Sequence, residues 1–181
     1  MDFQLVTNRV LRDLDEAGVR YALIGGYALG LWGATRATLD LDFLLLLEDL
    51  EKAEAVLSEY SYHVVFKSGD VAQYVSDLAP FGQIDALLAH RSISKAMLKR
   101  AELRSSAVGA LVELQPEDLI GLKLQALVND PKREERELED MRALLAASKP
   151  EGRSMDWELL EDYFSLFERE ELLEELKKAN G

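Results

Sequence analysis

The chain has 181 residues, of which 48% are hydrophobic, so it is long enough to bury one substantial core but too short for two full-sized domains. It contains no cysteine, which excludes disulfides, thiolate zinc sites and a cysteine nucleophile, and its two histidines argue against a histidine-rich metal site. The formal net charge of −13 gives the whole molecule a field that repels nucleic acid, so a polynucleotide partner would need a local basic patch.

The N-terminal half of the chain alternates helical and strand patterns, judged from the spacing of its apolar residues. In chain order, the predicted elements are a helix over 3–17, a strand over 21–24, a short helix over 27–32, a strand over 39–47, a helix over 49–60, and strands over 62–66, 71–75 and 83–88. This alternation predicts a mixed sheet with helices packed against it.

Helix formers dominate the C-terminal half. The predicted elements there are a helix over 94–103, a short strand over 111–114, helices from Pro116 onward, and one or two helices over 156–178. The whole pattern predicts an α/β (α+β) fold with a small mixed sheet flanked by helices and a helical C-terminal portion. Because 149–152 has the composition of a linker, we expect a main domain over 1–148 and a helical extension over 149–181 that packs on the same domain.

Further features of the sequence bear on where the chain resides and what it binds. It has no apolar run long enough to span a membrane and no recognisable secretory signal, so we expect no membrane segment and a cytoplasmic location. The acidic run near the C-terminus is typical of a solvated helix face. No lysine-arginine cluster is longer than Lys132-Arg133, which argues against binding of free RNA.

Three aspartates interrupt predicted strands that are otherwise apolar, where aspartate is depleted. Asp40 and Asp42 are two positions apart, so on a strand their side chains leave the same face. Such a pair is costly unless a cation neutralises it, and Mg²⁺ suits carboxylate ligands. If the strand that carries Asp85 lies beside 39–47, three carboxylates converge as a two-metal site requires. The alternative for each aspartate alone is a cap or a solvated strand end.

A glycine pair, Gly25-Gly26, follows a predicted strand and precedes a predicted helix. In that arrangement bare backbone amides and the start of a helix can hold phosphate. The residues that follow do not match the dinucleotide-binding fingerprint, and no Walker A lysine is present, so the pattern excludes Rossmann and P-loop sites.

Together these motifs resemble the DNA polymerase beta superfamily of nucleotidyltransferases, particularly its minimal and toxin–antitoxin-associated (AbiEii-like) members. The resemblance covers the glycine pair in 24–28, the paired acids, the third acid and three further segments. The run Arg36-Ala37-Thr38-Leu39-Asp40 is similar to the one that leads into the paired acids. The segments 116–123 and 136–140 are similar to helices in which the family carries a lysine and a Lys-Asp-x-x-Asp stretch, although this chain has Arg136-Glu137 there.

The resemblance implies an enzyme that moves a nucleoside monophosphate from a nucleotide triphosphate such as ATP to a hydroxyl of an acceptor. It implies that Gly25 and Gly26 contact the triphosphate, with Arg36 and Lys123 as further phosphate-binding cations. The residues implied to be both catalytic and metal ligands are Asp40, Asp42 and Asp85. They would hold two Mg²⁺ ions when the nucleotide is bound, with Mn²⁺ as an alternative, and Asp85 would help to deprotonate the attacking hydroxyl.

The acceptor stays open, since the family's acceptors include tRNA ends, protein side chains and small molecules. A second hypothesis is a catalytically weak or inactive protein of the same fold that acts as an antitoxin-like protein-interaction module. Its partner face would be the apolar helical stripe Trp157, Leu160, Tyr163, Phe164 and Phe167. The same spacing is also typical of side chains in a helical core.

Overall fold

The computed structural model describes residues 1–34, 38–148 and 154–180. The chain forms two compact units. The first unit comprises Met1–Ala28 and Ala37–Leu114, and the second comprises Leu29–Arg36 and Gln115–Gly181. Residues 115–148 therefore belong to the same compact unit as the predicted C-terminal extension.

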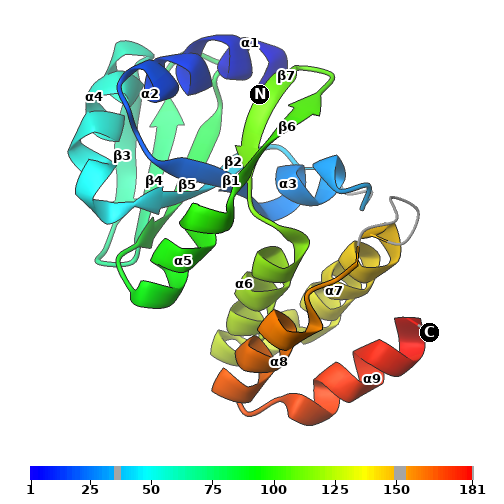
Figure 1. Ribbon diagram of the computed structural model, residues 1–181. Coiled ribbons are helices and arrows are strands. Elements are labelled where there is room, and N and C mark those ends of the chain that lie inside the picture. The colour runs from blue at the N-terminus through cyan, green and yellow to red at the C-terminus, as the bar shows by residue number, and fades with distance from the viewer. Residues whose placement is uncertain (35–37, 149–153, 181) are drawn as a thin grey trace. The chain divides into compact units, whose positions relative to one another are not determined.

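The first unit is built on a seven-stranded mixed sheet with the order β3-β4-β5-β2-β1-β7-β6 (Figure 1). Its strands are β1 (Tyr21–Ile24), β2 (Leu41–Leu46), β3 (Tyr62–Lys67), β4 (Val71–Ser76), β5 (Gln83–Ala89), β6 (Glu102–Ser106) and β7 (Gly109–Glu113). β2 pairs parallel to β5 and β1 parallel to β7, while the other neighbours are antiparallel. The predicted mixed sheet is thereby confirmed.

Helices cover this sheet. The helices of the first unit are α1 (Phe3–Val6), a π-helical turn (Thr7–Leu11), α2 (Arg12–Glu16), α4 (Leu50–Glu59) and α5 (Ser92–Arg100), and α3 (Gly25–Leu31) begins in it. α4 packs on β3 and α2, and α5 packs on β2 and β5. The N-terminal helical run ends before Gly18, whose φ of +67° is the left-handed conformation expected at that stop.

β2 is the central strand of the sheet, and both of its faces are buried. Leu41, Phe43 and Leu45 on one face and Leu44 and Leu46 on the other are each at most 8% exposed. A strand in this position reads as a nearly continuous apolar run, which is why Asp42 stands out in it.

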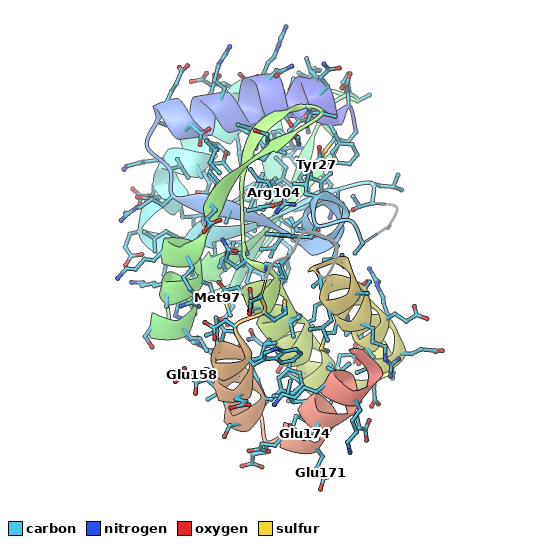
Figure 2. The ribbon with its side chains drawn as sticks, turned by 45° about the vertical axis from the view of Figure 1, so that its right-hand side comes forward. Tyr27, Met97, Arg104, Glu158, Glu171 and Glu174 are labelled. Carbon is cyan, nitrogen blue, oxygen red and sulfur yellow. The ribbon has the colours of Figure 1, made fainter. Side chains whose placement is uncertain are left out.

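The second unit is helical. From Gln115 onward its elements are α6 (Pro116–Asn129), a 3-10 turn (Pro131–Arg133), α7 (Glu134–Ser148), α8 (Trp157–Leu166) and α9 (Glu170–Asn180). α6 packs on α7 and α8, and α9 packs on both α7 and α8. Leu160, Tyr163 and Phe164 of the predicted stripe are at most 2% exposed and lie in this core. Acidic side chains such as Glu158, Glu171 and Glu174 are exposed on α8 and α9 (Figure 2).

Three predicted boundaries were wrong. α5 ends at Arg100, and the edge strand β6 begins at Glu102, where we expected the helix to continue to residue 103. β6 lacks the apolar alternation of a strand because it lies at the sheet edge, with Leu103 70% exposed. The short helix α3 begins at Gly25, without an intervening turn, and β2 begins only at Leu41. Within the described residues, no helix is long and apolar enough to cross a membrane.

Candidate active site

Asp42 and Asp85 are direct neighbours across the two central strands. In the parallel pairing of β2 with β5, Asp42 lies opposite Asp85, and the row continues to Ile24 on β1 and Gln73 on β4. Residues that pair in register project from the same face of a sheet. The predicted adjacency of these two strands is therefore confirmed, and the two carboxylates share one face.

Asp40 lies near Asp42 and Asp85 but is not on a strand. We expected it on the strand with Asp42, but it lies in a bend just before β2. The hydroxyl of Thr38 donates a hydrogen bond of 2.7 Å to Oδ1 of Asp40. Even so, Asp40, Asp42 and Asp85 each offer a carboxylate oxygen, and these oxygens lie within 4.8 Å of one another. All three residues are half-buried.

This donor set fits a hard divalent cation. Negative charges at such separations repel one another, and a cation bound among them relieves that repulsion. Carboxylate oxygens are the ligands that Mg²⁺ and Mn²⁺ take in proteins, and a cluster without histidine or cysteine does not favour softer metals. The three carboxylates are therefore a suitable ligand set for a divalent metal ion.

Gly25 lies directly against Asp42. Its φ is +66°, and a Cβ built on it would lie 1.9 Å from Oδ2 and 2.8 Å from the Cβ of Asp42. Both the backbone conformation and the space therefore require glycine at this position. The sequence pattern placed the glycine pair and the paired acids in separate motifs, whereas the structure places Gly25 and Asp42 in contact.

Tyr27 fixes the start of α3 in the first unit. Its ring stacks on Phe3 of α1, with the ring centres 4.8 Å apart and an interplanar angle of 24°. Tyr27 is labelled in Figure 2, near the first turn of α3. Burial raises the pKa of its hydroxyl. The stacked pair stabilises the segment that carries Gly25 and Gly26.

Two glutamines at the site were missed in the sequence. The side-chain amides of Gln83 and Gln73 donate to Oδ1 of Asp85 over 2.9 and 3.2 Å. Gln83 is two positions before Asp85, so its place on the same face could have been read from the strand pattern. Gln73 could not, because its place depends on the register between β4 and β5.

Lys123 and Arg36 were the predicted phosphate-binding cations. Lys123 lies on α6, and its Nζ is 2.9 Å from Oε2 of Glu137 and 2.6 Å from Oδ2 of Asp140. Glu137 also pairs with Arg133. These ion pairs join α6 to α7, and phosphate binding by Lys123 stays a prediction. Arg36 lies outside the described residues.

No protein-family model matches this sequence, and no curated protein matches it either. Solved structures do resemble the chain in fold. ANT(2″)-Ia in complex with adenylyl-2″-tobramycin aligns with a TM-score of 0.68 at 15% identity, over 93% of this chain and 98% of that one.

Two further structures extend the comparison. An antigenic nucleotidyltransferase-like protein from Paracoccidioides brasiliensis aligns with a TM-score of 0.60 at 15% identity, over 97% of this chain and 92% of that one. The lincosamide antibiotic adenylyltransferase LnuA, bound to lincomycin, aligns with a TM-score of 0.57 at 13% identity, over 81% of this chain and 98% of that one. The chain therefore has the fold of the nucleotidyltransferases.

Proposed function

We propose that this protein is a metal-dependent nucleotidyltransferase that transfers a nucleoside monophosphate from a nucleotide triphosphate to a hydroxyl of an acceptor. One observation carries the proposal: Asp40, Asp42 and Asp85 converge within 4.8 Å, with Gly25 held in a left-handed conformation against Asp42. The nucleotidyltransferase fold supports it. Fold alone does not determine chemistry, which depends on the residues of the site.

Each residue has a proposed role. Asp40, Asp42 and Asp85 would hold two Mg²⁺ ions, or Mn²⁺, which when bound supply positive charge at the triphosphate. Asp85 accepts the proton of the acceptor hydroxyl, whose oxygen forms a bond to the α-phosphorus while the bond to the pyrophosphate leaving group breaks. The backbone of Gly25 and Gly26 contacts the triphosphate, and Arg36 and Lys123 are further candidates to bind its phosphates.

For the acceptor we propose a small hydroxylated molecule, with positive charge favoured. A formal net charge of −13 attracts a cationic acceptor and repels a polyanion such as tRNA. Among proteins of this fold, ANT(2″)-Ia has been solved with adenylyl-2″-tobramycin and LnuA with lincomycin, and both ligands are small molecules. A tRNA or a protein acceptor is the alternative, and a role in a toxin–antitoxin system stays a prediction.

Calorimetry with ATP, CTP, GTP and UTP, each with Mg²⁺, tests the nucleotide site. We expect binding of at least one triphosphate that requires Mg²⁺ and is lost in the Asp40→Ala/Asp42→Ala variant. Asp77→Ala is the matched control, since the side chain of Asp77 is 77% exposed. If the wild-type protein binds no triphosphate, the enzyme proposal fails and the interaction-module hypothesis takes its place.

The acceptor needs a separate experiment. Labelled triphosphate and Mg²⁺ are incubated with the protein and a cell extract, and the products are separated into small molecules, nucleic acid and protein. Label in the small-molecule fraction that depends on Asp42 supports the proposed acceptor class. Label in tRNA or protein would replace it with one of the other two classes.

A further inference from the structure

We infer that Gln73 and Gln83 are positioning residues that hold Asp85 in the orientation needed to bind metal. The inference rests on the proposed function and goes beyond it, because neither glutamine belongs to the glycine and aspartate motifs. Two side-chain amides converge on one carboxylate oxygen. Both Nε2 atoms donate to Oδ1 of Asp85, over 2.9 Å from Gln83 and 3.2 Å from Gln73.

The sheet itself creates this convergence. Gln73 on β4 lies directly opposite Asp85 in the antiparallel register, and Gln83 lies two residues before Asp85 on β5. Both amides therefore project from the face that carries Asp42 and Asp85. A carboxylate can otherwise rotate broadly about its last torsion, and two donors on one oxygen restrict that rotation.

The donors leave part of the carboxylate available. The hydrogen bonds that the described side chains make to Asp85 go to Oδ1, so Oδ2 is left for a ligand. Changing a residue that orients a metal ligand through a hydrogen bond commonly lowers metal affinity by about 10–100-fold. The hydroxyl of Thr38 holds Oδ1 of Asp40 in a similar way.

The chemical nature of the donors matters as much as their position. An amide orients a carboxylate without cancelling its charge, whereas a lysine or arginine at the same place would compete with a metal ion. Neutral donors at Gln73 and Gln83 therefore orient the carboxylate of Asp85 without cancelling its negative charge. Negatively charged carboxylate oxygens are the ligands that suit a hard divalent cation.

The test measures Mn²⁺ binding without nucleotide, by electron paramagnetic resonance of the free ion. The variants are Gln83→Met, Gln73→Met and the double variant, because methionine has a similar length and cannot donate a hydrogen bond. Gln83→Leu and Gln73→Leu serve as second variants if a methionine variant does not fold. Gln4→Leu is the control, since Gln4 is exposed on α1.

We expect Gln83→Met to weaken Mn²⁺ binding about tenfold or more, which is within the range for outer partners of metal ligands. We expect a smaller loss for Gln73→Met, whose bond is longer, and no change for Gln4→Leu. The double variant should lose no more affinity than Asp85→Asn, because the glutamines act through Asp85. The thermal midpoints of the variants should stay close to that of the wild type, so that a change in Mn²⁺ binding reports orientation and not unfolding.

Two contrary results have different meanings. If wild-type protein binds Mn²⁺ and Asp85→Asn weakens binding, but every glutamine variant binds within twofold of wild type, the positioning role is overturned and the proposed function stands. If the wild-type protein binds neither Mn²⁺ nor a triphosphate, the proposed function fails and the positioning role fails with it.

Discussion

Gly25 and Asp42 share a contact that leaves no room for a side chain on the glycine: a Cβ there would lie 1.9 Å from Oδ2 of Asp42. The pairing of β1 with β2 produces this contact, since Ile24, just before Gly25, lies opposite Asp42. The C-terminal end of β1 and the carboxylate of Asp42 on β2 are therefore packed against each other. A change at the glycine must therefore move the carboxylate.

Gly25→Ala should abolish metal binding. Gly18→Ala is the matched control, because Gly18 has nearly the same φ, +67° against +66°, and no atom lies within 4 Å of its added Cβ. Both variants should lose roughly 1–2 kcal/mol of stability from the left-handed backbone. Only Gly25→Ala should lose Mn²⁺ binding as well. Equal Mn²⁺ affinity in the two variants would show that the contact with Asp42 does not matter for the site.

The pH dependence of stability should change when Asp49 is replaced. Asp49 is 2% exposed and accepts hydrogen bonds from the guanidinium and the backbone N of Arg20, which hold the pKa of its carboxyl well below the ordinary value of 3.8. A carboxyl whose pKa is lowered by folding stabilises the protein above its unfolded pKa, and this contribution is lost as the pH falls through the folded pKa.

Asp49→Asn should therefore cost roughly 1–3 kcal/mol at pH 7. We expect a cost near the low end of this range, because the side chain of Arg20 is 64% exposed and solvent screens its charge. The difference from wild type should shrink as the pH falls below about 4. Urea unfolding at pH 7, 4 and 3 measures it, with the exposed Asp77→Asn as control. A difference that stays constant over this range would contradict the ionic origin of the effect.

Replacing Lys123 should distinguish a role of this residue in stability from a role in nucleotide binding. The side chain of Lys123 is 11% exposed, and that of Glu137 is fully buried. Lys123→Met leaves buried carboxylates with one cation fewer and should cost about 3–5 kcal/mol, whereas Lys132→Met at an exposed position should cost little. Urea unfolding measures both. If Lys123→Met unfolds like wild type but binds ATP more weakly, Lys123 acts on phosphate and not in the core.

The fold was predictable from the sequence where the spacing of apolar residues matches their burial in the structure. The central strand was predictable because its apolar run could only be buried, and Asp42 and Asp85 stood out against that background. The convergence of Asp40 with them was also expected, although its place in a bend was not, since strand ends are set by tertiary pairing. β6 escaped prediction because an exposed edge strand lacks an apolar pattern.

The positions of Gln73 and Gln83 and the contact between Gly25 and Asp42 show a second limit of prediction from sequence. Gln73 meets Asp85 only because β4 pairs with β5 in one register, and a shift of one residue would turn Gln73 to the other face. No local pattern in a single sequence encodes that register. The contact between Gly25 and Asp42 likewise depends on how β1 pairs with β2.

Two helical glycines, Gly121 and Gly30, should respond in opposite ways to replacement by alanine. Gly121 lies within α6, and a Cβ there would be 2.8 Å from Cδ2 of Tyr163 in the same unit. Tyr163 is 2% exposed and donates a hydrogen bond of 2.5 Å to the buried Asp118, so its ring cannot easily move away. Gly30 in α3 has no atom within 4 Å of its added Cβ.

Alanine is favoured over glycine in a helix by about 0.5–1 kcal/mol, so Gly30→Ala should be neutral or slightly stabilising. Gly121→Ala should instead destabilise the protein by roughly 1–3 kcal/mol, because overpacking outweighs the gain in helix propensity. Urea unfolding of both variants measures the difference. In a Tyr163→Leu background the cost of Gly121→Ala should fall, since the opposing ring is gone. An unchanged cost in that background would place the strain somewhere other than the contact between Gly121 and Tyr163.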